Sequence, residues 1–141
     1  MSSIELHDAM LEFDDSGTGN AVVLLHGFPL ARSFWRQQVD VFCETHRVIV
    51  PDLRGHGHSS VSRGTASMSV MAADVIAILD ACEIDKATIC GLSMGGYVAW
   101  ELWRQYSHRL SALVLCNTRA AADNETVARA RHRYRSVART R

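Results

Sequence analysis

The sequence lacks the features by which membrane and secreted proteins are recognised. No run approaches the ~18 consecutive apolar residues that a membrane-spanning helix needs, and the mean hydropathy is -0.02. The first eight residues carry acidic side chains and no apolar stretch, so we expect no secretion signal. The sequence therefore predicts a cytoplasmic protein without a membrane partner.

Cysteine and histidine clusters of metal-binding type are also absent. The four cysteines have no Cys-x-x-Cys spacing and stand inside apolar runs, so we expect small core side chains rather than a disulfide framework or a zinc site. His56 and His58 share a glycine-rich loop, but no third ligand is spaced to join them. We interpret both as loop residues and expect neither a metal nor a cofactor.

Net charge is zero, because 15 basic side chains balance 15 acidic ones, but the charges are unevenly distributed. Seven arginines in residues 119–141 stand against Asp123 and Glu125, which gives this segment a local charge of +5. A segment of this kind can bind nucleic acid. Because alanine, valine, tyrosine and histidine alternate with the arginines and no nucleic-acid recognition motif accompanies them, we expect a solvated basic helix and no nucleic-acid partner.

What the sequence does contain is an alternation of apolar strands and helices. The run Ala21–Leu25 is apolar throughout, as in a strand buried on both faces of a parallel sheet. The helix expected after Gly96 is apolar almost all round, so Trp100 and Trp103 are interpreted as core side chains. We expect strands at 4–6, 10–13, 21–25, 47–50, 87–90 and 110–116, and helices at 33–45, 69–82, 97–107 and 124–139. This order predicts an α/β fold with a doubly wound, mostly parallel sheet and helices on both faces.

One motif carries chemistry, the pentapeptide Gly91-x-Ser93-x-Gly95. The composition of the chain gives roughly 0.05 chance matches to this pattern. The match follows a predicted strand and precedes a predicted helix, which is the arrangement of a nucleophile elbow. Glycine is needed at both outer positions because side chains there would collide with the neighbouring strand and helix. The pattern favours an exposed serine nucleophile at the positive end of a helix over a structural serine in a turn.

Three segments of the chain together resemble the α/β-hydrolase family. They occur in the family's order and spacing, and they read Leu24-Leu25-His26-Gly27-Phe28-Pro29, Pro51-Asp52-Leu53-Arg54-Gly55-His56-Gly57-His58-Ser59 and Gly91-Leu92-Ser93-Met94-Gly95-Gly96. The resemblance covers essentially all of the chain and corresponds to the N-terminal half of a family domain. It is closest to the small esterase and 3-oxoadipate enol-lactonase-like branch.

This resemblance implies a serine hydrolase that acts on small carboxylic esters or lactones. Ser93 is then the catalytic nucleophile, and the backbone N–H groups of Phe28 and Met94 form the oxyanion hole. The remaining motif residues are implied to have structural roles, and they are His26, Gly27, Asp52, Gly91 and Gly95. Cofactor-free haloperoxidase chemistry and hydrolytic C–C bond cleavage would reuse the same serine and stay open as alternatives.

Two members of the implied catalytic triad have no counterpart in the sequence. A serine nucleophile needs a base and a carboxylate that orients the base, and the family supplies both after later strands. Downstream of Ser93 the only histidines are His108 and His132, and neither stands at the family's base position. The residue directly after the last predicted strand is Asn117, and Asp123 follows some distance further on.

We therefore expect a partial domain, in which residues 1–118 form the core sheet and helices and residues 119–141 form a basic helix leading toward a missing cap. The sheet is expected to be truncated after about the sixth strand. The strand at 110–116 then becomes an apolar edge through which copies of the chain can associate. Without its acid and base the chain alone is expected to be inactive, so a non-catalytic binding or interaction protein stays open as an alternative.

Overall fold

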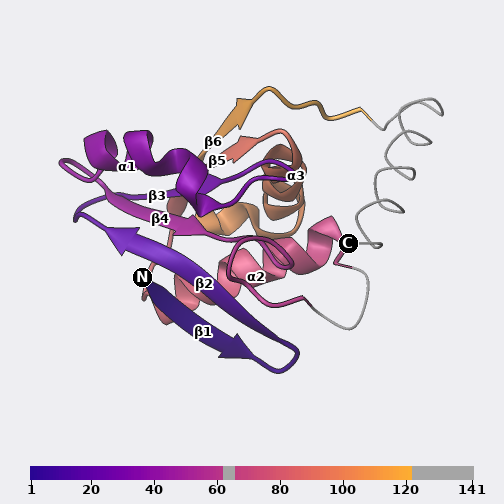
Figure 1. Cartoon of the computed structure of the whole chain (residues 1–141). Coiled ribbons are helices and arrows are strands. Elements are labelled where there is room, and N and C mark those ends of the chain that lie inside the picture. The colour runs from indigo at the N-terminus through magenta and orange to yellow at the C-terminus, as the bar shows by residue number, and fades with distance from the viewer. Residues whose placement is uncertain (62–65, 122–141) are drawn as a thin grey trace.

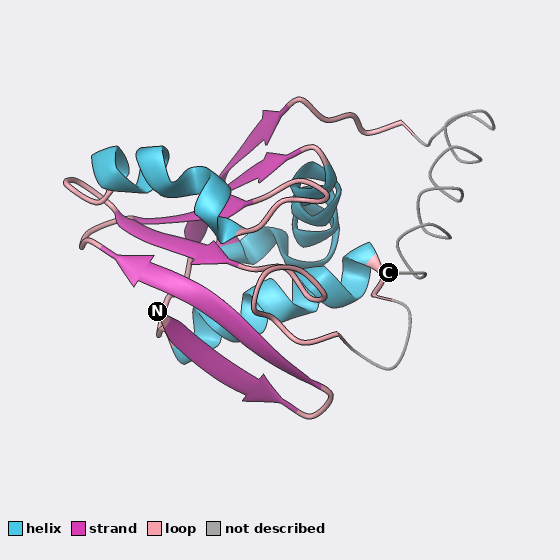
Figure 2. Cartoon of the chain, viewed as in Figure 1, coloured by secondary structure: helices cyan, strands magenta, loops and turns pink. Residues whose placement is uncertain are grey.

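The computed structural model contains one sheet with helices on both faces (Figures 1 and 2). It describes residues 1–61 and 66–121. The strands in these residues are β1 (Ser2–Leu6), β2 (Ala9–Ser16), β3 (Ala21–Leu25), β4 (Arg47–Pro51), β5 (Ala87–Leu92) and β6 (Leu110–Cys116). The helices are η1 (Arg32–Trp35), α1 (Arg36–Phe42), α2 (Met68–Ala81), α3 (Met94–Tyr106) and η2 (Ser107–Arg109), of which η1 and η2 are 3₁₀ turns. The predicted α/β class is confirmed.

The sheet is mostly parallel, with an antiparallel hairpin at one side. β1 and β2 form the hairpin, and β2 pairs antiparallel with β4. β4, β3, β5 and β6 are parallel to one another. The spatial order β1-β2-β4-β3-β5-β6 means that the chain moves from β3 to β4 on one side and then returns to β5 on the other side of β3.

Side chains of the central strands alternate between two core clusters, one on each face of the sheet. Val23 and Leu25 belong to the larger cluster, which includes residues of α2 and α3, whereas Leu24 packs with Trp35 on the face covered by η1 and α1. This alternation follows from the two-residue period of a strand. The apolar residues of α2 that face the larger cluster are Met71, Val75, Ile78 and Leu79.

The first and third helical regions differ from the sequence prediction. The helix expected at 33–45 is instead the 3₁₀ turn η1 followed by the short helix α1, which ends at Phe42. α3 begins at Met94, three residues before the expected start. The side chain of Trp103 is 54% exposed, so its interpretation as a core residue is wrong. It stands on the surface with its ring 5.9 Å from that of Trp100.

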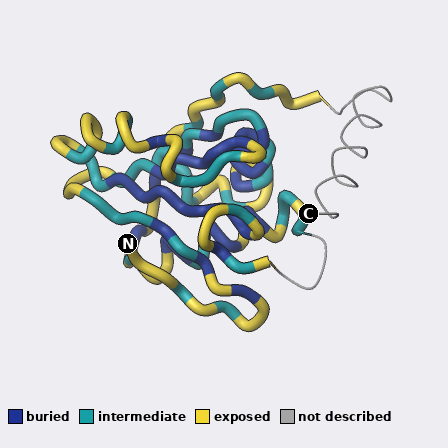
Figure 3. Tube along the Cα trace, viewed as in Figure 1, coloured by how far each residue is buried: buried dark blue, intermediate teal, exposed yellow. Residues whose placement is uncertain are grey.

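β6 is an edge strand of the sheet in the described residues, and much of it is exposed (Figure 3). Its large apolar side chains Val114 and Leu115 are 44% and 37% exposed. An edge strand offers unpaired backbone groups to solvent, and here apolar side chains accompany them. Residues 122–141, which include most of the predicted basic helix, lie outside the described residues, as do His132 and Asp123.

Cys43, Cys82 and Cys90 pack at the margins of the two clusters rather than inside them, which corrects the expectation of core side chains. All four are partly exposed free thiols. The Sγ atoms of Cys90 and Cys116, on neighbouring strands, are 3.8 Å apart, and burial raises the pKa of the Cys90 thiol to about 12. Within residues 1–61 and 66–121, every helix is too short or too polar to cross a membrane.

Candidate active site

The order of the strands indicates where a ligand-binding site is expected in the sheet. The chain leaves β3 toward β4 and later returns to β5 on the opposite side of β3, so the connections after these two neighbouring strands diverge. In open α/β sheets such a switch point leaves a crevice at the carboxyl ends of the strands, where ligands bind. Here the switch point lies between the segment that follows Leu25 and the segment that follows Leu92.

Ser93 stands alone between β5 and α3, since β5 ends at Leu92 and α3 begins at Met94. Its backbone has φ 51° and ψ -108°, a conformation that non-glycine residues rarely adopt. The side chain does not cap α3. The Ser93 hydroxyl is therefore presented from a sharp turn at the positive end of a helix.

The two motif glycines stand where backbone segments touch. A Cβ on Gly91 would lie 2.7 Å from Cα of Gly96 in the first turn of α3. A Cβ on Gly95 would lie 2.8 Å from the carbonyl oxygen of His26, in the chain that follows β3. These separations are shorter than non-bonded carbon contacts allow, so any larger residue would force α3 away from the sheet.

The segment after β3 brings Phe28 to the same edge as Ser93. A Cβ on Gly27 would lie 3.2 Å from Cβ of Ser93, so the two turns are in contact. The segment bends through a hydrogen bond from the Leu30 N–H to the Gly27 carbonyl, 2.9 Å. The Phe28 side chain is 55% exposed. Met94 is the first residue of α3, and an N–H at this position has no acceptor within the helix.

His26 is fully buried and links this turn to the loop after β4. Its Nε2 accepts a hydrogen bond from the Leu53 N–H at 3.0 Å, and its Nδ1 lies 3.0 Å from the Gly27 carbonyl, to which it donates. Burial lowers the pKa of His26, which keeps the ring neutral. Both ring nitrogens are engaged, so His26 is not available as a base for Ser93.

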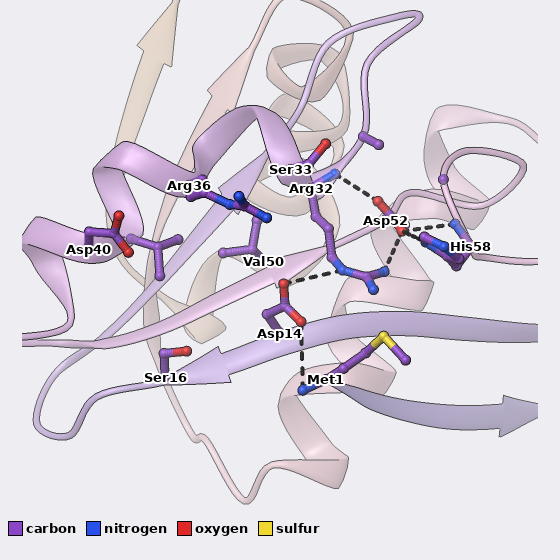
Figure 4. A pocket seen from close by; sticks show the side chains of 13 residues that line it. Met1, Asp14, Ser16, Arg32, Ser33, Arg36, Asp40, Val50, Asp52 and His58 are labelled. Carbon is purple, nitrogen blue, oxygen red and sulfur yellow. Dashed lines mark hydrogen bonds and ion pairs between the residues drawn. The ribbon is translucent and has the colours of Figure 1, made fainter.

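Asp52 is buried and organises the loop after β4. Its carboxylate accepts hydrogen bonds from the backbone N–H groups of Arg32 at 2.7 Å and His58 at 2.9 Å, and it forms an ion pair with the Arg32 guanidinium. Arg32 also pairs with Asp14 on β2 at 3.2 Å. These groups line a hollow of about 360 Å³ over β2 and β4 (Figure 4). Ser93 does not line this hollow.

The two loop histidines differ in their surroundings. The ring of His56 stands edge-on to those of Phe28, at 5.9 Å, and His26, at 5.3 Å, and its Nδ1 bonds to the Arg54 carbonyl at 3.2 Å. The side chain of His58 is 76% exposed. In the described part of the chain, no three histidine, cysteine, aspartate or glutamate side chains are grouped as metal ligands would be.

Of the two histidines downstream of Ser93, only His108 belongs to the described residues, and it does not lie beside Ser93. His108 lies in η2, beyond the far end of α3. A helix of 13 residues is about 20 Å long, so His108 is remote from the elbow. Asn117, directly after β6, has a positive φ of 43° and marks a turn.

Sequence reasoning missed a buried charge network beneath the glycine-rich loop. The guanidinium of Arg54 binds both carboxylate oxygens of Asp74 in α2, at 2.8 and 2.6 Å, and also binds Asp8 at 2.6 Å. Arg54 and Asp74 are buried. The Arg54 pKa is raised, chiefly by its hydrogen bonds to Asp74. Arg54 stands inside the second motif segment, but nothing in the sequence pattern indicated its partners.

The comparisons with known proteins agree with this geometry. A family model described as the alpha/beta hydrolase fold matches residues 20–139, so the chain belongs to the α/β-hydrolase family. It is 33% identical over 120 residues to 3-oxoadipate enol-lactonase 2 of Acinetobacter baylyi, a match that covers 84% of this chain and 45% of that protein. It is 31% identical over 120 residues to bifunctional epoxide hydrolase 2 of Sus scrofa, which covers 83% of this chain and 22% of that protein.

Among solved structures, a thermophilic esterase from Thermogutta terrifontis superposes with a TM-score of 0.90 and 41% identity, covering 94% of this chain and 52% of that one. These three relatives are named as hydrolases, and the resemblance to the enol-lactonase-like branch is confirmed. The chain spans about half the length of the lactonase and of the esterase that it matches.

Proposed function

We propose that Ser93 is the nucleophile of a hydrolase that acts on small carboxylic esters or lactones. The observation that carries the proposal is the strained turn that holds Ser93 between β5 and α3, at the switch point of the sheet. A fold tolerates strain of this kind where the surrounding structure requires it, and such strain clusters at active sites. The similarity to an enol-lactonase and to an esterase supports esters and lactones as the substrate class.

The oxyanion hole in this proposal consists of the N–H groups of Phe28 and Met94. Attack of the Ser93 oxygen on an ester carbonyl forms a C–O bond and places negative charge on the carbonyl oxygen, which two fixed N–H donors stabilise. A base takes the Ser93 proton and passes it to the ester oxygen, so that the C–O bond to the alcohol breaks as the carbonyl re-forms. Water then attacks the acyl-enzyme, releases the acid and returns a proton to the Ser93 oxygen. The contact between Gly27 and Ser93 supports this arrangement, since it brings the Phe28 turn against the nucleophile.

The base and the acid are proposed not to be among the 141 residues of this chain, so the chain alone turns over no faster than its oxyanion hole permits. A triad that lacks a member keeps only the residual catalysis of the hole and of binding. The lack of a base beside Ser93 in this proposal can be tested directly by adding a base to the solution. Imidazole can enter the site and accept the Ser93 proton in place of the absent histidine.

The experiment measures the release of p-nitrophenol from p-nitrophenyl acetate at increasing imidazole concentrations. We expect the chain to exceed its Ser93→Ala variant by a margin that grows with imidazole, because only the chain offers the hydroxyl. Ser107→Ala, at the other end of α3, is the matched control and is expected to behave as the unaltered chain. Equal rates for the chain and Ser93→Ala at every imidazole concentration would overturn the proposal in favour of a non-catalytic binding protein.

A further inference from the structure

We propose that Thr118 is a positioning residue that fixes the direction of the Met94 N–H in the oxyanion hole. The inference rests on the proposed function and concerns a residue outside all three motif segments. Thr118 stands two residues after the end of β6, and its Oγ1 donates a hydrogen bond of 2.8 Å to the carbonyl oxygen of Ser93.

The hydrogen-bonded carbonyl belongs to the same peptide group as the Met94 N–H. A peptide group is planar, and in the trans form its C=O and N–H point in opposite directions. Holding the Ser93 oxygen toward Thr118 therefore holds the Met94 hydrogen toward the opposite side. The same oxygen also accepts a hydrogen bond from the Gly96 N–H at 3.0 Å.

The peptide group before Ser93 is held by the same part of β6. The Ser93 N–H donates to the Cys116 carbonyl at 2.9 Å. Both peptide groups that flank the strained residue are thus attached to the end of β6, one through backbone and one through the Thr118 hydroxyl. Because the Ser93 conformation is costly by itself, these bonds oppose its relaxation to an ordinary turn.

The chain around Thr118 is shaped to bring its side chain over the elbow. Asn117 has φ 43°, which turns the chain sharply after β6. The Thr118 side chain then lies on Gly96, where an added Cβ would be 2.6 Å from Cβ of Thr118. Gly96 stands outside the Gly-x-Ser-x-Gly pentapeptide, and this contact explains why the position carries no side chain.

The test compares Thr118→Val, which removes the hydroxyl but keeps the shape, with Thr118→Ser, which keeps the hydroxyl. In the imidazole-assisted assay we expect Thr118→Val to lower the Ser93-dependent rate about tenfold, the size of one net hydrogen bond, without raising KM. Thr118→Ser is expected to keep most of the rate. Thr45→Val is the control for a threonine hydroxyl lost elsewhere, because Thr45 is exposed and its hydroxyl bonds to the ring of the adjacent His46.

A second measurement keeps this inference separate from the proposed function. Amide hydrogen exchange at Met94 reports how firmly the peptide group is held, whether or not Ser93 reacts. We expect faster exchange in Thr118→Val than in Thr118→Ser and in the unaltered chain. If no Ser93-dependent rate exists, the proposed function fails. The exchange rate at Met94 then tests by itself whether the Thr118 hydroxyl holds the peptide group between Ser93 and Met94. Equal exchange in all three proteins, or a Thr118→Ser variant as slow in acyl transfer as Thr118→Val, would overturn the role of the hydroxyl.

Discussion

The ion pair between Arg54 and Asp74 joins the glycine-rich loop after β4 to α2, and we expect its loss to lower the free energy of unfolding substantially. The two side chains are 3% and 6% exposed, so both charges have been removed from water. Two hydrogen bonds in a fork join them, at 2.8 and 2.6 Å. In Asp74→Ala the buried guanidinium keeps, among the described residues, its bond to Asp8, whose side chain is 59% exposed.

Breaking a buried pair by removing one partner costs about 3–5 kcal/mol. Small domains have a total stability of only about 5–15 kcal/mol, so Asp74→Ala removes a large share of it. With a urea dependence of about 2 kcal/mol per molar, the midpoint of unfolding should fall by about 2 M. The assay is urea unfolding followed by circular dichroism, with the slope compared between variants.

Two further variants show whether the buried charge is the cause. Asp8→Ala removes the exposed partner of the same arginine and should shift the midpoint far less than Asp74→Ala. The double variant Arg54→Met, Asp74→Leu removes both charges and should recover most of the loss, because no unpaired charge stays buried. The reasoning fails if Asp74→Ala shifts the midpoint no more than Asp8→Ala does.

Three other properties follow from the structure. Burial lowers the pKa of His26 below its value in the unfolded chain. The stability that the neutral ring contributes is therefore complete above about pH 6.5 and is lost as the pH falls. Between about pH 7.5 and 5.5 the urea midpoint should fall more steeply for the unaltered chain than for His26→Gln. Gly91→Ala should lower stability by about 1–3 kcal/mol because its Cβ meets the backbone of α3, and an unchanged thermal midpoint would contradict the contact. The 141-residue chain should self-associate through the exposed edge of β6, and light scattering should show Val114→Lys shifted toward monomer; an unaltered chain that stays monomeric would contradict this.

The sequence predicted the central strands because apolar runs are a direct signal of burial on both faces of a sheet. Ala21–Leu25 is observed as a strand with the expected bounds, and the strand at 110–116 also matches. The start of α3 was placed too late because Gly95 and Gly96 are poor helix formers. They are present for close packing rather than for helix propensity. The sequence predicted the position of Ser93 because Gly91 and Gly95 form a recognisable pattern with it.

Contacts between residues far apart in the sequence left no comparable signal. Arg54 and Asp74 are 20 positions apart, and Thr118 and Ser93 are 25 apart. Each pair meets only after the crossover connections have been folded. Trp103 was assigned to the core because its helix is apolar in composition, whereas α3 has polar residues at 104 and 105 on its exposed end. Composition does not show which side of a helix the rest of the fold leaves uncovered.

The claim that Ser93 is the nucleophile is tested most directly by locating the acyl group after reaction. The chain is incubated with p-nitrophenyl acetate and imidazole, quenched in acid and mapped by tandem mass spectrometry. The account predicts an acetyl group on Ser93, present in the Thr45→Val control and absent from Ser93→Ala. Acetylation at other nucleophiles, with Ser93 unmodified in the folded chain, would contradict it.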